Sequence, residues 1–292
     1  MVNSTPYIGR FAPSPSGPLH FGSLIAALGS FLRARSLGGQ WLVRIEDIDP
    51  PREIAGASDQ ILTTLAAYGM HWDSTVLYQS QRLDVYQQQI NQLLATDNAY
   101  YCQCTRKEIK AMGGSYDGRC GTRIQPHKTG AIRIRNHYGV AQFQDQLKGT
   151  IAVDSQFAAE DFIIKRSDGL YAYQLAVVLD DIHQQITEVV RGSDLLEPTC
   201  RQISLFKLLN CPSPDWLHLP LACAEKGRKL SKQNHAAAID IIKPQTSINA
   251  ALTFLGQAQV DTETDVRLML DQAVDQFNLN QVPQQSEILL VT

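Results

Sequence analysis

The sequence predicts an α/β fold in which helices pack on a parallel sheet. Residues 7–12 ("YIGRFA") and residues 41–49 ("WLVRIEDID") have the composition of strands, and the largely apolar residues 21–37 between them are typical of a helix. A strand, a crossover helix and a second strand form the unit of parallel sheets, whose ligand sites lie at the carboxyl ends of the strands. With 292 residues, of which 44% are hydrophobic, the chain is long enough for about two domains.

The other expected elements follow in chain order. Gly38 and Gly39 end the first helix, and Ser80 caps a later one. Two more helices are expected over residues 57–68 and 81–96. Further strands are expected over residues 131–135, 150–154, 161–166 and 186–191. The chain becomes polar from about residue 226 and is expected to end in helices.

Composition argues against a membrane protein and against a secreted one. No run approaches the roughly eighteen apolar residues that a membrane-spanning helix needs. Residues 1–10 lack the charged and then apolar pattern of a secretory signal. Six cysteines, three of them between positions 102 and 120, do not form the pattern of a disulfide framework. We therefore expect a cytoplasmic protein with a metal site.

The formal net charge of −3 hides an uneven distribution of charged residues. Residues 104–135 contain eight Lys and Arg against two acidic residues, whereas residues 240–292 contain two basic and seven acidic residues. A basic segment of this kind can follow the phosphates of a nucleic acid while the remaining surface stays acidic. A solvated loop face explains the same charges equally well.

The segment between the first strand and the first helix is rich in proline and glycine. Four of its residues fix an irregular turn and delay the start of the helix: Pro13, Pro15, Gly17 and Pro18. The helix can then begin near His20, with Gly22 allowing close approach to its first turn and Ser23 one helical turn further on. The N–H groups at a helix start favour phosphate. A prolyl turn that caps a core helix is the competing interpretation.

Residues 226–232 form a second candidate segment. Four basic residues lie in it, together with Gly227 and Ser231: Lys226, Arg228, Lys229 and Lys232. Basic side chains on a loop suit a triphosphate whose charge shifts when the α-phosphorus is attacked, and the loss of one such donor can cost ~3 kcal/mol. An ordinary solvated turn is the alternative interpretation.

Together the two segments resemble the paired signature motifs of class I aminoacyl-tRNA synthetases. The sequence "HFGS" at residues 20–23 resembles the HIGH motif, and "KLSKQ" at residues 229–233 resembles the KMSKS motif, each with two departures from the family spelling. Three further blocks are similar to glutamyl-tRNA synthetases: "RFAPSPSG" from residue 10, "RIEDIDPPR" from residue 44, and residues 177–202. The resemblance runs from about residue 7 to residue 240.

A full glutamyl-tRNA synthetase continues past the second motif into a helical anticodon-binding region, whereas residues 234–292 are few and acidic. The chain therefore resembles the short glutamyl-Q tRNA(Asp) synthetase family. This resemblance implies a Rossmann-like catalytic domain in two halves, a zinc-bearing insertion and a C-terminal helical region, without an anticodon-binding domain. The expected bounds are 1–98 and 171–225 for the two halves, 99–170 for the insertion, and 226–292 for the KMSKS-like loop and helices.

The resemblance also implies the activity. The family activates L-glutamate with ATP and Mg²⁺ to glutamyl-adenylate, and transfers the glutamate to queuosine in the anticodon of tRNA(Asp). Activation is expected to proceed without tRNA, and we expect a monomer. Two alternatives are a truncated glutamyl-tRNA synthetase that charges tRNA(Glu), and a non-catalytic RNA-binding paralogue.

Site residues are implied in the same way. His20 and Lys232 are expected to stabilise the charge that develops on the phosphates. The expected ATP-binding residues are His20, Gly22, Ser23, Lys229, Ser231 and Lys232, and the expected glutamate-binding residues are Arg10, Ala12, Ser14, Glu46, Tyr173 and Arg191.

The chemistry of glutamate suits these residue types. A guanidinium binds a carboxylate with two parallel hydrogen bonds, so Arg191 or Arg10 is expected to bind the side-chain carboxylate. Glu46 can accept from the α-ammonium group, and the Tyr173 hydroxyl can add a polar contact. An ion pair between Arg10 and Glu46, and simple packing of Tyr173, explain the same residues without a ligand. The carboxylates of residues 180–181 are expected to orient backbone or RNA groups rather than to act in catalysis.

Cys102, Cys104 and Cys120 form the candidate metal site. Three thiolates need a fourth ligand for tetrahedral zinc. Spacing leaves three candidates open: Tyr116, Asp117 and His127. Zinc chemistry favours the histidine, whereas the family resemblance implies Tyr116. Because the cluster lies away from the ATP motifs in sequence, we expect a structural zinc ion whose basic flank steadies RNA; unmetallated core cysteines are the alternative.

Overall fold

The computed structural model describes residues 6–230, 237–262 and 265–290. At its centre lie two groups of parallel strands. They are β1 (Ile8–Phe11), β2 (Gln40–Ile45) and β3 (Leu77–Tyr78) in one group, and β9 (Glu188–Gly192) and β10 (Asp215–Leu219) in the other. The Thr187 N–H donates to the Ile8 carbonyl oxygen at 2.9 Å, so β9 lies beside β1 and the spatial order is β3-β2-β1-β9-β10.

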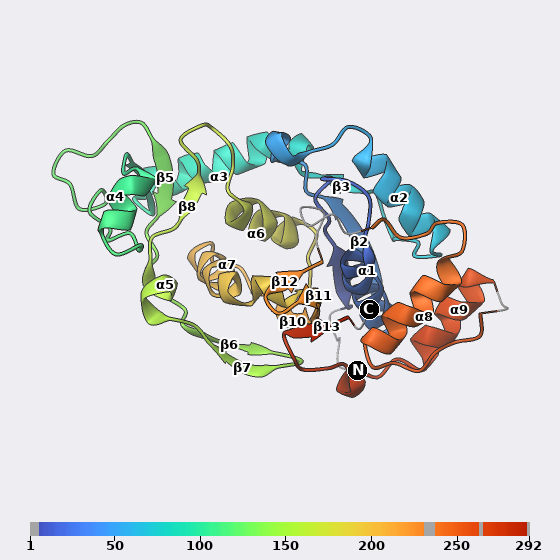
Figure 1. The fold of residues 1–292 in the computed structure, drawn as a ribbon. Helices are drawn as coiled ribbons and strands as arrows, with labels where there is room; N and C mark the ends of the chain where they lie inside the picture. The colour runs from blue at the N-terminus through green and yellow to red at the C-terminus, as the bar shows by residue number, and fades with distance from the viewer. Residues whose placement is uncertain (1–5, 231–236, 263–264, 291–292) are drawn as a thin grey trace, which may run out of the picture.

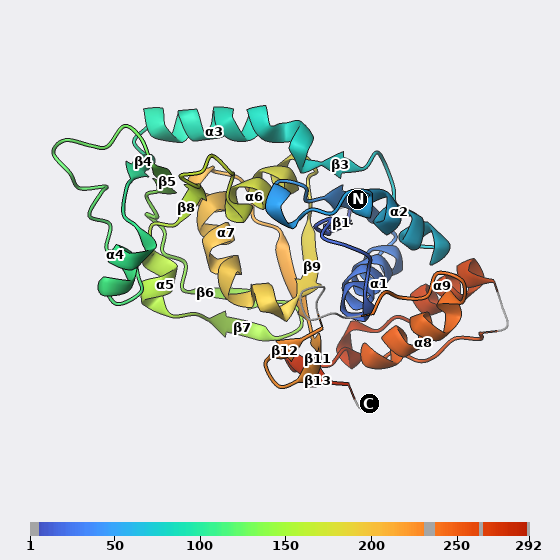
Figure 2. The ribbon, with the colours of Figure 1, turned by 45° about the horizontal axis from the view of Figure 1, so that its top comes forward.

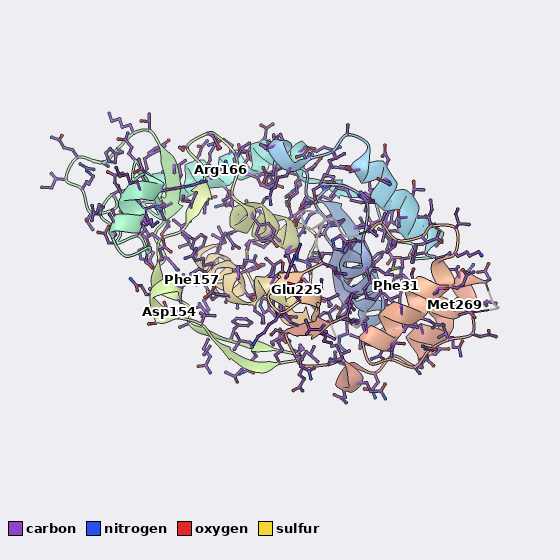
Figure 3. The ribbon with its side chains drawn as sticks, in the orientation of Figure 1. Phe31, Asp154, Phe157, Arg166, Glu225 and Met269 are labelled. Atoms are coloured by element: carbon purple, nitrogen blue, oxygen red, sulfur yellow. The ribbon has the colours of Figure 1, made fainter. Side chains whose placement is uncertain are left out.

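Helix α1 (Phe21–Ser36) connects β1 to β2 and is buried along most of its length. The sheet covers one side of it, and the C-terminal helices α8 (Pro244–Phe254) and α9 (Val266–Asp275) pack on it (Figure 1). Phe31 of α1 and Met269 of α9 belong to the same core, and Figure 3 labels both. Helix α2 (Ala57–Ala67) adds Ile61 and Leu65 to this core.

The other face of the sheet is covered by α3 (Leu83–Ala95), α6 (Tyr173–His183) and α7 (Leu196–Leu208). Side chains alternate between the two faces of a strand. Accordingly, Leu42 of β2 belongs to the core under these three helices, whereas its neighbours Trp41 and Val43 belong to the core around α1. The sheet is therefore buried on both faces, as expected for parallel strands joined by helices.

Between α3 and α6 the chain leaves the central sheet and forms an insertion, at the left of Figure 1. Its antiparallel sheet has the order β4-β5-β8, with strands β4 (Ala99–Cys102), β5 (Ala131–Ile134) and β8 (Ile163–Lys165), and helices α4 (Arg106–Ala111) and α5 (Ser155–Ala159) flank it. A hairpin of β6 (Gln142–Asp145) and β7 (Gly149–Ala152) returns to the central sheet (Figure 2). There the Gln146 N–H donates to the Trp216 carbonyl oxygen at 2.8 Å.

A small sheet follows β10. Its middle strand β11 (Leu221–Glu225) pairs in parallel with β13 (Glu287–Leu289) and antiparallel with β12 (Arg228–Lys229). Short 3₁₀ helices lie at Pro50–Arg52, Gln79–Arg82, Ser193–Leu195 and Leu279–Gln281. Every described helix is too short or too polar to cross a lipid bilayer.

The predicted strand–helix–strand unit is confirmed, and the four predicted strands after residue 130 are present within two residues of their expected bounds. Gly38 ends α1 with a φ of 64°, which lets its N–H donate to the Arg35 carbonyl oxygen at 2.9 Å. The predicted cap at Ser80 is wrong. Helix α3 begins at Leu83 after a 3₁₀ turn, and the Ser80 hydroxyl instead donates to the Asp47 carboxylate at 2.6 Å.

Candidate active site

The start of α1 is shaped by His20. This residue has extended backbone geometry and caps the helix, and its Nδ1 accepts the Ser23 N–H at 3.3 Å. The first N–H groups of any helix lack partners within the helix, and its start carries partial positive charge. This end of α1 lines a cavity of about 190 Å³ together with the segment around Pro220. The first predicted motif therefore lies where a phosphate group can bind.

The second predicted motif reaches the same cavity. Lys229 and Leu230 line it, and the Lys229 Nζ lies 2.5 Å from an Asp194 carboxylate oxygen. A Cβ atom at Gly22 would lie 3.1 Å from the His20 ring and 3.4 Å from the Leu230 carbonyl oxygen, so a glycine suits this close approach.

The structure thus brings together four of the six expected ATP-binding residues: His20, Gly22, Ser23 and Lys229. The other two, Ser231 and Lys232, lie outside the described residues.

A cluster of buried charges lies between the sheet and α6. Arg10 of β1 donates from Nε to Asp181 of α6 at 3.1 Å, and Arg44 of β2 donates from Nη1 to the same carboxylate oxygen at 2.8 Å. Burial raises the pKa of Asp181, but the two guanidiniums lower it by more, so the net shift is below the usual value. Asp181 is therefore held ionised between two arginines.

Glu46 follows β2 and faces the same cluster. Its carboxylate lies 3.4 Å from Nη2 of Arg44, whereas Arg10 pairs with Asp181. These two ion pairs stand in place of the Arg10–Glu46 pair that the sequence offered as an alternative to glutamate binding. Burial raises the pKa of Glu46 against the opposing charges of the arginines. The Glu46 N–H donates to the Pro13 carbonyl oxygen at 3.0 Å, which brings the loop of Ala12 and Ser14 against it.

Arg191 of β9 differs from the other two arginines. Its side chain is buried, and among the described residues it has no carboxylate within ion-pair distance. Its hydrogen-bond partners are neutral: the Thr199 hydroxyl at 2.7 Å, the His218 ring at 3.1 Å, the Leu195 carbonyl oxygen at 3.3 Å and the Tyr173 hydroxyl at 3.5 Å. Burial lowers the pKa of Arg191 and raises that of Tyr173. A buried cation with neutral partners favours an anionic ligand.

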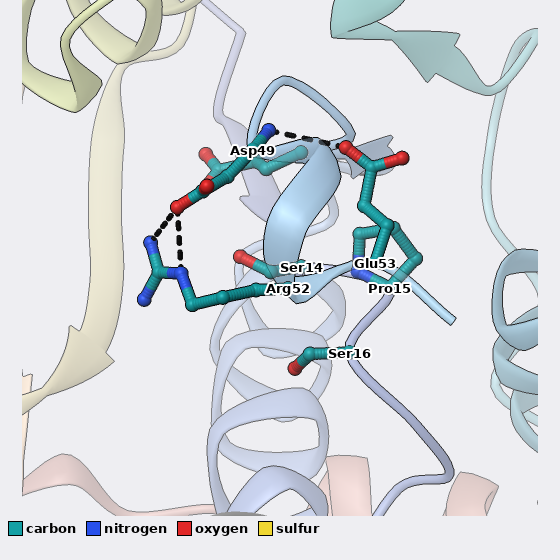
Figure 4. A pocket seen from close by; sticks show the side chains of 7 residues that line it. Ser14, Pro15, Ser16, Asp49, Arg52 and Glu53 are labelled. Carbon is teal, nitrogen blue, oxygen red and sulfur yellow. Dashed lines mark hydrogen bonds and ion pairs between the residues drawn. The ribbon is translucent and has the colours of Figure 1, made fainter.

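Two neighbouring cavities, of about 270 and 290 Å³, open beside Glu46 and share Ser14, Asp49 and Arg52 in their walls. Figure 4 shows Asp49 in the first of them: its carboxylate accepts from Arg52 Nε at 2.6 Å, and its N–H donates to Glu53 at 3.1 Å. The second cavity extends to the insertion, where Arg166 and Tyr171 line it, and to Tyr173 at the start of α6. This cavity therefore adjoins Tyr173, whose hydroxyl accepts a hydrogen bond from Arg191.

The three expected metal-binding cysteines come together in the insertion. The sulfur atoms of Cys102, Cys104 and Cys120 all lie within 4.8 Å of one another, and those of Cys104 and Cys120 are 3.5 Å apart. Tyr116 is buried in the same cluster, and its hydroxyl accepts the Cys120 N–H at 2.9 Å. Of the other two candidates, Asp117 pairs with Arg119 at 2.7 Å, and the His127 ring lies 2.7 Å from Arg123.

Four buried residues at the site were missed or misassigned from the sequence: Arg44, Asp180, Asp181 and His218. The expectation that residues 180–181 orient backbone or RNA groups is wrong. Asp180 accepts from the side chains of Gln79, Arg82 and Tyr86 at 2.6–2.8 Å, and Asp181 from the two arginines of the sheet. Arg44 could have been found from the alternation of β2, which places it on the same buried face as Leu42. A buried arginine there requires anionic or polar partners.

Known proteins are similar to this chain over almost all of its length. A family model described as tRNA synthetases class I (E and Q), catalytic domain, matches residues 8–288. A glutamyl-Q tRNA(Asp) synthetase from Shewanella frigidimarina is 70% identical over 287 residues, which are 98% of this chain and 97% of that protein. The glutamyl-Q tRNA(Asp) synthetase of Escherichia coli K12 is 54% identical over 285 residues, which are 97% of this chain and 92% of that protein.

Solved structures share the fold. A glutamate tRNA ligase from Elizabethkingia meningosepticum, in complex with its amino acid, superposes with a TM-score of 0.80 at 25% identity, covering 96% of this chain and 66% of that chain. A glutamate-tRNA synthetase from Elizabethkingia anophelis gives the same TM-score and covers 97% of this chain and 68% of that chain. The chain thus spans about two thirds of these ligases.

Proposed function

Because this chain belongs to the glutamyl-Q tRNA(Asp) synthetases, within the class I tRNA synthetases, we propose that it activates L-glutamate with ATP and transfers it to queuosine in the anticodon of tRNA(Asp). The observation that carries the amino-acid part is the buried Arg191, which lacks a carboxylate partner among the described residues. Relatives named glutamyl-Q tRNA(Asp) synthetase match over nearly their full length, which favours this acceptor over tRNA(Glu).

Arg191, rather than Arg10, binds the side-chain carboxylate of glutamate in this proposal. Arg10 already has Asp181 as its anion, whereas the Nη1 of Arg191 has, among the described residues, only the long hydrogen bond to the Tyr173 hydroxyl. Glu46 accepts from the α-ammonium group, and the Tyr173 hydroxyl contributes a polar contact. Ala12 and Ser14, on the loop against Glu46, complete the set of glutamate-binding residues.

ATP binds in the cavity at the start of α1. An oxygen of the α-carboxylate of glutamate attacks the α-phosphorus of ATP, and pyrophosphate leaves. His20, Gly22 and Ser23 present the helix start to the phosphates, while Lys229 and the predicted Ser231 and Lys232 supply positive charge and hydrogen bonds. Mg²⁺ bound to ATP would screen the phosphate oxygens. No covalent protein nucleophile is needed, because the substrate carboxylate is itself the nucleophile.

The cavity between Glu46 and the insertion receives the acceptor nucleoside. A hydroxyl of the queuosine cyclopentenediol attacks the carbonyl carbon of glutamyl-adenylate, an ester forms, and AMP leaves with the hydroxyl proton passing to solvent or phosphate. Tyr171 offers a face on which a base can stack, and Arg52 and Arg166 offer charge for the flanking phosphates. This placement uses the cavity that adjoins the proposed glutamate site.

We further propose a structural zinc ion in the insertion, held by Cys102, Cys104, Cys120 and Tyr116. Tetrahedral coordination at about 2.3 Å from each sulfur places thiolates about 3.8 Å apart, and the observed sulfur separations, 3.5 Å for one pair and at most 4.8 Å for the others, fit this arrangement. Once bound, the ion would hold the loop from β4 to β5 in place. Tyr116 is favoured because it shares the cluster, while the side chains of Asp117 and His127 have partners elsewhere.

Glutamate transfer to tRNA(Asp) isolated with and without queuosine tests the function, with tRNA(Glu) alongside. We expect labelling of the queuosine-bearing tRNA(Asp) alone. Labelling of tRNA(Glu) would mean a truncated glutamyl-tRNA synthetase. Pyrophosphate exchange that depends on glutamate distinguishes the enzyme from a non-catalytic RNA-binding paralogue. A monomeric state and a cytoplasmic location stay predictions from the sequence.

A further inference from the structure

Arg191 is held by neutral groups, and one of them is a buried histidine outside every motif of the sequence. Nε of Arg191 lies 3.1 Å from Nε2 of His218, and Nη2 donates to the Thr199 hydroxyl at 2.7 Å. The guanidinium carbon lies 5.0 Å from the centre of the Trp216 ring. The guanidinium is therefore fixed on three sides, which leaves Nη1 as the nitrogen that faces Tyr173 at 3.5 Å.

The tautomer of His218 follows from its second neighbour, Asp145. One carboxylate oxygen of Asp145 lies 2.7 Å from Nδ1 of His218 and 3.0 Å from its backbone nitrogen. An ionised carboxylate only accepts hydrogen bonds, so Nδ1 carries the proton. A guanidinium only donates, so Nε2 of the same ring carries none. Both neighbours select the same neutral tautomer.

We propose that His218 is a positioning residue for glutamate binding: it accepts the Nε–H of Arg191 and so holds the guanidinium with Nη1 turned toward the glutamate site. This inference rests on the proposed role of Arg191 in the function above. Burial is the main cause that lowers the pKa of His218, to about 4, against the opposing hydrogen bond to Asp145. The ring is thus neutral, and its Nε2 is available as an acceptor, at the pH of the cell.

The arrangement also links the glutamate site to the insertion. Asp145 is the last residue of β6, and its other oxygen accepts the N–H groups of Leu147 and Lys148 at 3.0 and 2.9 Å. One carboxylate therefore fixes both the turn of the hairpin and the ring of His218. A guanidinium whose plane is already fixed loses less conformational entropy when it binds a carboxylate, so the hairpin contributes to glutamate affinity without touching glutamate.

Two substitutions at His218 separate positioning from packing. In His218→Asn the side-chain nitrogen takes the place of Nδ1, which keeps the bond to Asp145 and removes the acceptor for Arg191. In His218→Gln the side-chain oxygen takes the place of Nε2, which keeps that acceptor.

In glutamate-dependent pyrophosphate exchange, we expect His218→Asn to raise the KM for glutamate by about tenfold or more, with the KM for ATP unchanged. We expect His218→Gln to stay within about threefold of wild type. His183→Asn, an exposed histidine at the end of α6, is the matched control.

Equal losses in the two His218 variants, or a rise in the KM for ATP as large as that for glutamate, would overturn the proposal. Arg191→Ala distinguishes a failure of the proposed role of Arg191 from a failure of the positioning role of His218. If Arg191→Ala leaves the KM for glutamate unchanged, the role of Arg191 in the proposed function fails; if it raises that KM while His218→Asn does not, only the positioning role fails. Should both His218 variants unfold, ¹⁵N-histidine NMR on the wild-type protein decides. A ring protonated at Nδ1 and bare at Nε2 supports the proposal, and the opposite tautomer overturns it.

Discussion

The carboxylate of Asp181 lies 3.1 Å from Nε of Arg10, although the two residues are separated by 171 positions in the sequence. The same carboxylate accepts from Arg44, which also pairs with Glu46. Two buried cations thus face two buried anions. Arg191 has no carboxylate within ion-pair distance among the described residues, and this is the basis of the proposal that it binds the side-chain carboxylate of glutamate.

Removing the charge of Asp181 is expected to destabilise the fold. Asp181→Asn leaves two buried guanidiniums without the anion that they share, and breaking a buried pair of this kind costs about 3–5 kcal/mol. Urea unfolding measures the change in the free energy of unfolding. Asp168→Asn, which breaks an exposed pair with Arg166, is the control and should change it by less than about 1 kcal/mol. A similar small change in Asp181→Asn would contradict the balance of charges described above.

The free energy of unfolding is expected to decrease as the pH falls, because His218 has a lowered pKa in the folded protein. In the folded protein the pKa of His218 is about 4, whereas the unfolded chain has the ordinary value near 6.5. Between about pH 4 and pH 6.5 the unfolded state therefore binds the proton more readily than the folded state. The stabilisation is complete above about pH 6.5 and is lost as the pH falls toward 4, by about 3 kcal/mol in total. The groups that face the ring are Asp145, Arg191 and Thr199, with the charge of Lys148 nearby.

Urea unfolding of wild type and His218→Gln between pH 7 and pH 4 measures this contribution. Carboxylates elsewhere titrate in both proteins, so the difference between the two slopes isolates the histidine. Parallel slopes would show that His218 does not titrate with a lowered pKa.

Some parts of the site were predictable because their signals are local in sequence. His20 and Gly22 lie in one short segment, and the prolines before them determine where α1 starts. The choice between Arg10 and Arg191 was not predictable, since both are arginines near the ends of strands and only the contact with Asp181 distinguishes them. That contact depends on how α6 packs on the sheet.

His218 was missed for a similar reason. It lies in an apolar strand, where a histidine is most often a core residue with a local partner, and its partner Asp145 is on a hairpin of the insertion. The register of β10 against that hairpin brings them together, and no local pattern encodes it. A weak signal exists, because a buried aspartate and a buried histidine each require a polar partner.

Zinc is expected at one ion per chain. Cys120→Ser removes a thiolate, so elemental analysis should show loss of the metal, and the melting temperature should fall by about 5 °C. Cys211→Ser is the matched control, because Cys211 lies outside the cluster and should retain the metal. Retention of zinc in Cys120→Ser would contradict the proposed ligand set.

Tyr116→Phe and His127→Ala then decide the fourth ligand, since only the substitution of a true ligand weakens zinc affinity in competition with a chelator.

Lys229 is expected to act on ATP. Lys229→Met removes a positive charge from the wall of the cavity at the start of α1, and the rate of pyrophosphate exchange should fall by about a hundredfold. The KM for glutamate should change little, because the proposed glutamate site lies at Arg191 and not in this cavity. Lys207→Met, an exposed lysine of α7, serves as the control. If the two variants exchange pyrophosphate equally well, Lys229 takes no part in activation.

The insertion is expected to bind the RNA backbone through exposed basic residues. Five of them have no ion pair within the described part of the chain: Arg106, Lys107, Lys110, Arg123 and Lys128. The double variant Lys107→Glu and Lys110→Glu should raise the KM for tRNA(Asp) in the transfer step and leave pyrophosphate exchange unchanged. Because each phosphate contact releases bound cations, the dependence of tRNA binding on salt should weaken by about one unit of slope per lost contact.

The control for this surface is a double variant of the same charge change elsewhere, Lys207→Glu and Lys243→Glu, both exposed and outside the insertion. It changes the net charge by the same amount, so a general electrostatic effect on tRNA would affect both variants alike. A larger effect of the insertion variant on the salt dependence shows that tRNA contacts this surface directly. Equal effects would mean that the basic residues of the insertion are a solvated face, which is the alternative that their charge pattern left open.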